Sequence, residues 1–307
     1  MSLLKDALEA GKFGITAEMA PPKGYDFTEQ MEAAELLAGK VHGVNVTDMQ
    51  SASLKATGLG LCIKLKQAGV EPILQMTGRD RNRMALMGDA LAAASFGIDT
   101  MLALTGDHPV VGDCKDAKPV YDLDSVGILK MLSKMEETNC DCGGNEIAGG
   151  APKFYKGASV TPVYEPLFLQ INKLRQKVEA GAMYIQTQGI FDLDTFKRFM
   201  EEVDKAGIKT HIMAGIIPLK AAGMAKYMNE NVPGIDVPQD MIDRLAAAAA
   251  EGKEKGVKGL PMQLGIEMAA EMIAKIKDEK LCDGVHIMAI GAEKNVPTIL
   301  DKAGLSI

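Results

Sequence analysis

The sequence lacks tryptophan and has few other aromatic residues and few cysteines. Aromatic side chains make up 5% of the 307 residues, and 20 methionines take over part of the filling of the core. The five cysteines are an odd number spread over a long chain, which indicates reduced thiols and a cytoplasmic location. Cys140 and Cys142 lack the second pair of ligands that a structural zinc site needs, so no metal site is predicted.

Long apolar runs, an excess of positive charge and several common motifs are also missing. No apolar run approaches the roughly 18 residues that span a bilayer, and residues 1–10 carry acids that predict a short amphipathic helix instead of a secretory leader. The net charge of −7 argues against nucleic acid and anionic membranes as partners. Without GxSxG, HExxH, P-loop or GxGxxG patterns, the chain shows no hydrolase triad, zincin, nucleotide-kinase or separate dinucleotide-binding signature.

Short apolar segments of strand type alternate along the chain with longer segments of helical period. The predicted strands cover residues 13–20, 43–47, 71–77, 99–105, 157–162, 183–188, 209–217 and 284–290. The predicted helices cover 29–38, 51–68, 82–96, 124–137, 166–180, 193–206, 219–230, 238–252 and 258–278. This alternation predicts an α/β fold, a single-domain (β/α)8 TIM barrel over residues 1–307 with extra helices between strands seven and eight. A doubly wound open sheet is the alternative.

Polar residues gather where the predicted strands end, at the face that carries the chemistry of a barrel. They are Glu18, Asn45, Thr47, Asp48, Gln75, Thr77, Thr105, Asp107, Thr161, Gln186 and Gln188. Buried polar groups are costly there unless they bind a ligand or pair with one another. Glu18 stands out because Pro21 and Pro22 end its strand abruptly and rigidly.

The four histidines contribute one candidate to this face. His108 directly follows Asp107. His42, His211 and His286 fall before or within predicted strands and are expected to be ordinary packed residues.

Three arginines crowd into the start of one predicted helix, the end whose dipole favours anions. Arg79, Arg81 and Arg83 can face solvent, pair with acids or contact a phosphate, and the sequence leaves these explanations open. Arg175 and Lys177 on the fifth-unit helix add positive charge. A cofactor with one or two phosphates would suit both groups.

A series of short motifs runs along nearly the whole chain. They are AEMAPPK at 17–23, VT at 46–47, TGRDRNR at 77–83, LALTGD at 102–107, KPVY at 118–121, GASVTP at 157–162, KVEAGA at 177–182, QTQGIFD at 186–192, AGIIP at 214–218 and DGVH at 283–286. In this order the series resembles the methylenetetrahydrofolate reductase family, whose members are flavin-dependent (β/α)8 barrels.

The resemblance implies a reaction in two halves. Electrons reduce a bound flavin, and hydride then passes to the one-carbon unit of 5,10-methylenetetrahydrofolate, giving 5-methyltetrahydrofolate. The five-membered ring of this substrate must open to an iminium first, and opening needs a proton donor. Glu18 matches the family's general acid, Asp107 the acid beside flavin and pterin, and Gln188 the residue that hydrogen-bonds the pterin.

The implied cofactor is FAD, with FMN as the alternative. The matching flavin positions are Thr47, Gln75, Thr105, Gly106, Asp107, Tyr121, Thr161 and Lys177, with Arg175 as a further source of positive charge. Gln75 replaces the usual histidine, and Gln170 and Lys173 replace the usual aspartate and asparagine near the ribose and phosphate. These replacements leave FAD and FMN both open.

The substrate side also departs from the family pattern. Family members typically have Leu-Asn-Arg after the last strand. This chain has Ile-Gly-Ala at residues 290–292, and so lacks an arginine that is expected to help bind folate. A substrate-contacting glutamine falls near Met224 and an aromatic position near Tyr227. The distal folate contacts are therefore expected to differ, or a partner helps to complete the site.

Two functional hypotheses follow, a catalytic flavoprotein reductase and a flavin-binding barrel subunit of an electron-transfer complex. The presence of Glu18, Asp107 and Gln188 together favours catalysis. The electron donor is NADH, NADPH or an iron–sulfur partner protein. The sequence leaves open whether the chain forms a homo-oligomer or a hetero-complex.

Overall fold

The computed structural model describes residues 2–307, and its strands close into a barrel. Within these residues eight parallel strands follow one another in chain order, and β1 pairs with both β2 and β8. Their bounds are β1 Gly14–Met19, β2 Gly43–Val46, β3 Pro72–Thr77, β4 Thr100–Leu104, β5 Tyr155–Val160, β6 Tyr184–Gly189, β7 His211–Ile216 and β8 Gly284–Ile287. Because β8 returns to β1, the sheet has no open edge, which confirms the TIM barrel and excludes the doubly wound sheet.

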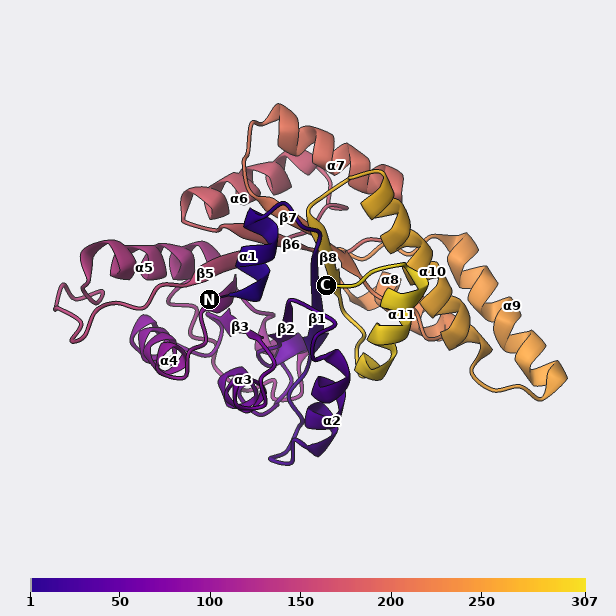
Figure 1. Cartoon of the computed structure of the whole chain (residues 1–307), viewed down its shortest axis with the longest axis horizontal. Helices are drawn as coiled ribbons and strands as arrows, with labels where there is room; N and C mark the ends of the chain where they lie inside the picture. The colour runs from indigo at the N-terminus through magenta and orange to yellow at the C-terminus, as the bar shows by residue number, and fades with distance from the viewer. Residues whose placement is uncertain (1) are drawn as a thin grey trace.

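Helices surround the barrel (Figure 1). Their bounds are α1 Leu3–Glu9, α2 Thr28–Leu37, α3 Gly58–Gln67, α4 Arg83–Ser95, α5 Ser125–Thr138, α6 Leu167–Glu179, α7 Leu193–Lys205, α8 Ala222–Asn231, α9 Gln239–Lys255, α10 Leu260–Asp278 and α11 Val296–Lys302. Short 3-10 segments are η1 Gln50–Ala52, η2 Pro109–Val111 and η3 Glu293–Asn295. Within residues 2–307, no helix has both the length and the apolar character needed to cross a lipid bilayer.

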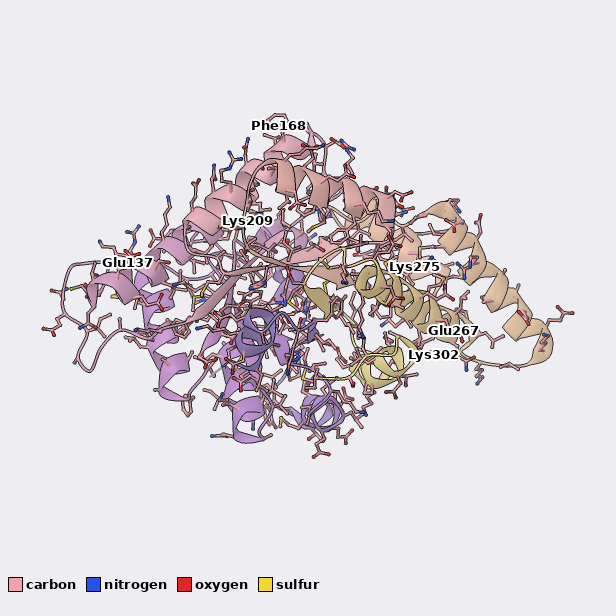
Figure 2. The ribbon with its side chains drawn as sticks, turned by 45° about the horizontal axis from the view of Figure 1, so that its top comes forward. Glu137, Phe168, Lys209, Glu267, Lys275 and Lys302 are labelled. Carbon is pink, nitrogen blue, oxygen red and sulfur yellow. The ribbon has the colours of Figure 1, made fainter. Side chains whose placement is uncertain are left out.

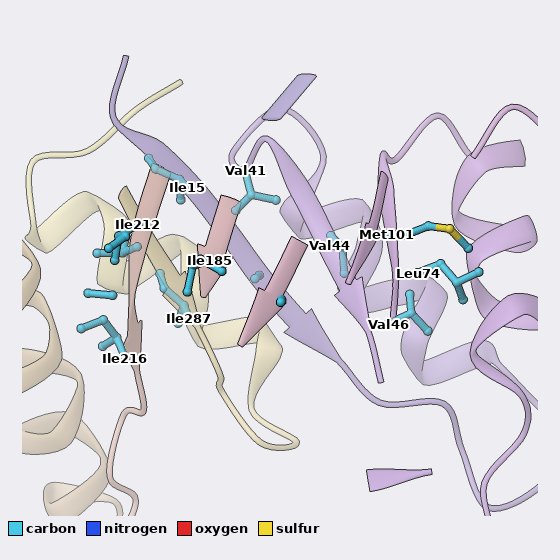
Figure 3. Close-up of a cluster of buried hydrophobic side chains, with 14 of the residues drawn as sticks. Ile15, Val41, Val44, Val46, Leu74, Met101, Ile185, Ile212, Ile216 and Ile287 are labelled. Carbon is cyan, nitrogen blue, oxygen red and sulfur yellow. The ribbon is translucent and has the colours of Figure 1, made fainter. Parts of the chain in front are cut away.

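Every second residue of the strands faces outward and packs against the helices. On β1 these residues are Ile15, Ala17 and Met19, all buried in the main hydrophobic core. Figure 3 shows equivalent side chains on other strands, including Ile185 and Ile287. Since side chains alternate along a strand, the residues between them face the barrel lumen.

The lumen is apolar at the amino ends of the strands and polar at their carboxyl ends. The apolar layer, here called the lumen floor, consists of Leu4, Leu8, Ile73, Leu102, Tyr155, Tyr184 and Met213. Leu4 and Leu8 come from α1, which therefore closes the amino end of the barrel. Gly14 permits this contact, because a Cβ there would lie 2.9 Å from Leu8 Cδ2.

Between β7 and β8 the chain forms α8, α9 and α10. Residues of α8 and α9, such as Met228 and Leu245, belong to a hydrophobic cluster separate from the main core. In contrast, α10 also packs into the main core through residues such as Ile273. It lies beside α11, where Lys302 Nζ is 3.2 Å from Glu267 Oε1 (Figure 2).

Several boundaries differ from the prediction. The helix predicted over 51–68 begins only at Gly58, because Ser51 and Ala52 have positive φ values of 55° and 51° and Ser53 and Thr57 are extended. The fifth strand starts at Tyr155 rather than at residue 157. The helix α11 was not predicted, since its seven residues are too few to show a clear helical period.

Candidate active site at the carboxyl end of the barrel

A cavity of about 530 Å³ opens where the strands end. Side chains of β1, β3, β4, β5, β6 and β8 line it, together with residues of α6 and of the loops that follow strands. The cavity reaches down to the lumen floor, because Leu102 is part of the cavity lining and of the lumen floor. Its volume falls within the roughly 300–1,000 Å³ common for small-molecule sites.

Eight of the predicted site residues line this cavity. They are Glu18, Gln75, Thr105, Gly106, Asp107, Thr161, Lys177 and Gln188. These residues are spread over 171 positions of the sequence, and closure of the parallel barrel brings them to one face.

Thr47 and Tyr121 do not line the cavity but form hydrogen bonds to residues that do. Thr47 is buried, and its Oγ1 donates a hydrogen bond to Oε1 of the lining residue Gln50 over 2.8 Å. The Tyr121 hydroxyl donates to the backbone oxygen of Gly106 over 3.1 Å. Both residues therefore hold lining residues in place.

Arg175 and Tyr227 do not line the cavity. Lys173 and Lys177 are one helical turn apart on α6 and line the cavity, so Arg175 between them lies on another face of the helix. Arg175 Nη2 instead approaches the backbone oxygen of Ala206 at 3.5 Å. Tyr227 on α8 is 62% exposed. The geometry gives neither residue a contact with the cavity.

Glu18 enters the cavity because it occupies an inward position of β1. Gln75 Nε2 donates to Glu18 Oε2 over 3.1 Å, and His286 Nε2 lies 3.6 Å from the same oxygen. The Glu18 side chain is 22% exposed. A carboxyl group that a ligand can reach and that neighbouring donors hold in place can act in proton transfer.

A buried polar network lies one layer deeper in the lumen. It consists of Thr16, Asn45, Gln186 and His286, each at most 3% exposed, and is called the lumen network below. Thr16 Oγ1 lies 3.0 Å from His286 Nδ1 and accepts a hydrogen bond from Gln186 Nε2 over 3.1 Å. Gln186 and Asn45 exchange two hydrogen bonds of 2.7 and 3.1 Å. The network therefore satisfies its own buried polar groups.

The histidine at the cavity is His286 rather than His108. His108 Nδ1 accepts a hydrogen bond from the Val110 amide over 3.2 Å at the start of η2, and its side chain is not part of the lining. His286 lines the cavity beside Glu18, which contradicts the expectation of ordinary packing. The sequence carried a signal for this position: Val285 and Ile287 are apolar and face the helices, so His286 must face the lumen.

The three arginines near the start of α4 pair with carboxylates. The pairs are Arg79 with Asp80, Arg81 with Asp48 and Asp89, and Arg83 with Asp122. Hydrogen bonds from Arg83 lower the pKa of the Asp122 carboxyl to about 2. All three arginines thus pair with acids, one of the explanations that the sequence left open, and Arg79 also lines the cavity.

Asp107 follows β4 at the cavity mouth. Gly106 before it has a φ of 90°, and a Cβ there would lie 3.0 Å from Arg79 Cβ and 3.2 Å from Thr77 Cβ, so the turn requires glycine. Asp107 Oδ2 accepts a hydrogen bond from the Ser51 amide over 3.1 Å. Because Asp107 is exposed, its negative charge stays solvated.

Positive charge reaches the cavity from the side opposite Glu18. Lys177 Nζ donates to the backbone oxygen of Ser159 on β5 over 2.5 Å, and β5 lies four strands from β1 in the closed barrel. Burial and the nearby Lys173 ammonium lower the pKa of Lys177 to about 8. Within residues 2–307, no carboxylate forms an ion pair with Lys177.

The structure shows the state of the five cysteines. All five are free thiols. Among residues 2–307, no group of three histidine, cysteine, aspartate or glutamate side chains is arranged to hold a metal ion.

Comparison with known proteins places the chain in a family. Residues 3–304 match the profile of the family described as methylenetetrahydrofolate reductase. A probable methylenetetrahydrofolate reductase (NADPH) of Caenorhabditis elegans is 25% identical over 255 residues, which cover 83% of this chain and 34% of that protein. A probable methylenetetrahydrofolate reductase (NADH) of Oryza sativa subsp. japonica is 26% identical over 321 residues, which cover 98% of this chain and 50% of that protein.

This chain therefore spans between a third and a half of the length of these two relatives. Among solved structures, an uncharacterized protein from Clostridium thermocellum that binds two copies of 5-methyl-5,6,7,8-tetrahydrofolic acid superposes with a TM-score of 0.66. The sequence identity to it is 15%, and the match covers 99% of this chain and 100% of that chain, so it shows a shared fold. On the match over residues 3–304, the chain belongs to the methylenetetrahydrofolate reductase family.

Proposed function

We propose that the chain is a flavin-dependent reductase that converts 5,10-methylenetetrahydrofolate to 5-methyltetrahydrofolate. Family membership supports the reaction class. The observation that carries the proposal is the Glu18 carboxyl in the cavity, with Gln75 and His286 both directed at its Oε2. A barrel that served only as a scaffold would have no use for this arrangement.

The residues present fit a flavin. Gln75, Thr105 and Thr161 offer amide and hydroxyl groups along the cavity to the polar edge of the ring system. Lys177 is a buried ammonium without a carboxylate partner in the described chain, which suits the phosphate of FAD or FMN. A flavin bound here would supply the hydride that reduces the one-carbon unit.

The chain's own residues handle the substrate and its proton. Glu18 gives a proton to the ring nitrogen that leaves as the five-membered ring opens, and takes a new proton from solvent after turnover. The Gln188 amide, which lines the cavity, both donates to and accepts from the pterin. Asp107, at the cavity mouth, would disfavour further negative charge on a flavin bound there.

NADH or NADPH is the proposed electron donor, because the names of the two relatives specify one or the other. An iron–sulfur partner protein is the alternative donor. Anaerobic mixing of the flavin-loaded protein with each nucleotide distinguishes them. Rapid loss of flavin colour supports the nucleotide, and retention of colour with both nucleotides points to a protein donor.

The reaction itself is tested by colour and by one substitution. The purified chain, loaded with FAD or FMN, should bleach anaerobically when methyltetrahydrofolate is added. Glu18→Gln should slow this folate step by about 10²- to 10⁴-fold, as loss of a general acid does, while flavin reduction by nucleotide keeps its rate.

Glu35→Gln serves as the matched control, because Glu35 is an exposed glutamate on α2. It should leave both rates unchanged. Failure to bind either flavin would refute the flavin proposal, and an equal loss of both rates in Glu18→Gln would refute the acid role.

A further inference from the structure

We infer that His286 is a positioning residue that, together with Gln75, makes Glu18 Oε1 the oxygen that delivers the proton. The inference rests on the proposed function of Glu18 as an acid and specifies how the barrel aims it. Two nitrogen atoms lie close to Glu18 Oε2: Gln75 Nε2 at 3.1 Å and His286 Nε2 at 3.6 Å. Among residues 2–307, Oε1 has no hydrogen-bond partner.

The lumen network determines which nitrogen of His286 carries the proton. The two amide hydrogens of Gln186 Nε2 point to Asn45 Oδ1 and Thr16 Oγ1, each at 3.1 Å. Thr16 Oγ1 is therefore an acceptor toward Gln186, and among residues 2–307 the one acceptor within reach of its own hydrogen is His286 Nδ1, at 3.0 Å. An accepting Nδ1 leaves the proton of the neutral imidazole on Nε2, which faces Glu18.

An Nε2–H group and the Gln75 amide then present two donors to one carboxyl oxygen. A proton on Oε2 would oppose both donors, so the acid form of Glu18 carries its proton on Oε1. At 3.6 Å, Nε2 lies beyond hydrogen-bond distance of Oε2, and we expect it to move closer when the carboxylate becomes charged.

This arrangement favours transfer of the proton from Glu18 Oε1 to the substrate. As the Oε1–H bond breaks, an N–H bond forms on the substrate nitrogen and the carbon–nitrogen bond of the five-membered ring breaks. The negative charge left on Glu18 meets donors that are already in place at Oε2, so little reorganisation is needed. The carboxylate later recovers its proton from solvent at Oε1.

The tautomer is measured directly by nitrogen-15 NMR of protein labelled at histidine. The chain has four histidines, so substitution of His286 identifies its signals. The expected result is a protonated Nε2 and an unprotonated Nδ1. The proton on Nδ1 would mean that the Asn45 and Gln186 amides are reversed and would overturn the inference.

Thr16→Val tests the origin of the tautomer. It removes the hydroxyl that faces Nδ1 with almost no change in shape, and the preference for Nε2–H should be lost. Thr100→Val is the control, because Thr100 is also a buried strand threonine but its hydroxyl bonds to Ser2 Oγ over 2.7 Å. An unchanged tautomer in Thr16→Val would contradict the assignment.

Kinetics then test the positioning role. His286→Leu should slow the folate step by about 10- to 100-fold, the loss expected for one hydrogen bond to a charged group, without slowing flavin reduction by the donor. His286→Gln places an amide N–H near the position of Nε2 and should recover most of the rate. Equal rates in the two variants, or equal loss of both steps, would refute the role.

The two proposals fail in distinguishable ways. If the wild-type protein does not turn over methylenetetrahydrofolate, the proposed function fails, and with it the task given to Oε1. The NMR result is independent of any turnover and still decides whether the lumen network sets the His286 tautomer.

Discussion

Lys177 shows how one buried charge links the cavity to the stability of the fold. Its ammonium is mostly buried and donates to the Ser159 carbonyl, and burial with the nearby Lys173 lowers its pKa from 10.5 to about 8. Asp124 opposes this change without cancelling it. The ligand-free protein therefore carries a desolvated cation that a bound phosphate would stabilise.

Lys177→Met should change the pH dependence of stability. Between pH 8 and 10.5 the unfolded state binds more protons at Lys177 than the folded state, so the free energy of unfolding rises with pH in this window. The substitution should remove that rise, which is at most about 3 kcal/mol. Urea denaturation at several pH values measures it, with the exposed Lys130→Met on α5 as control. Parallel curves for wild type and Lys177→Met would contradict the prediction.

At the scale of an element, two helices contain interior glycines in opposite environments. Gly88 is exposed on α4, and a Cβ there would meet nothing within 4 Å. Gly265 on α10 lies against the backbone of the segment after β7, where a Cβ would overlap the Leu219 carbonyl oxygen. The glycine of α10 thus allows the helix to approach the barrel closely.

The same substitution should therefore have opposite effects in the two helices. Gly88→Ala should raise the free energy of unfolding by about 0.5–1 kcal/mol, because alanine loses less backbone entropy in a helix. Gly265→Ala should lower it by about 1–3 kcal/mol, because α10 must shift to relieve the overlap. Thermal or urea unfolding of the two variants gives both values, and a stabilised Gly265→Ala would show that α10 is not in tight contact there.

For the whole molecule, the closed barrel and the helices inserted between β7 and β8 differ in how much apolar surface they bury. The eight strands pair in a ring and share the main core, whereas α8 and α9 depend on a smaller cluster beside it. Figure 1 shows α9 projecting from the barrel. Regions with less apolar burial open at lower free energy than the core.

Native-state hydrogen exchange should reveal this difference. Backbone amides of α8 and α9 should exchange through a partial opening, while those of the strands and of α3 and α5 exchange only with global unfolding. Mass spectrometry of peptic fragments at low denaturant separates the two groups. Uniform protection over all these elements would mean that the excursion unfolds together with the barrel.

Much of the site follows from strand ends read in sequence. The sequence predicts that Glu18, Gln75, Asp107 and Gln188 lie together, because polar residues at the carboxyl ends of parallel strands meet at one face, and all four line the cavity. Arg175 does not line the cavity, because the helical phase of α6 turns Lys173 and Lys177 toward it, and a charge run along a helix does not state which charges face inward.

His286 was missed for a different reason. A lone histidine within an apolar strand is usually a packed residue, and only closure of β8 onto β1 brings it to Glu18. The pairing of Arg81 with Asp48 was equally out of reach, since it joins residues that follow different strands, β3 and β2.

By itself, the sequence determined the barrel, its order of units and the identity of the groups at its mouth. The reason is that the period of apolar residues and the polar residues at strand ends can both be recognised from residues close together in the chain. The tertiary structure alone decided which of these groups touch. Hydrogen bonds such as Gln75 to Glu18 and Gln186 to Thr16 act over about 3 Å between residues remote in the chain, and only the register of the closed barrel sets such distances.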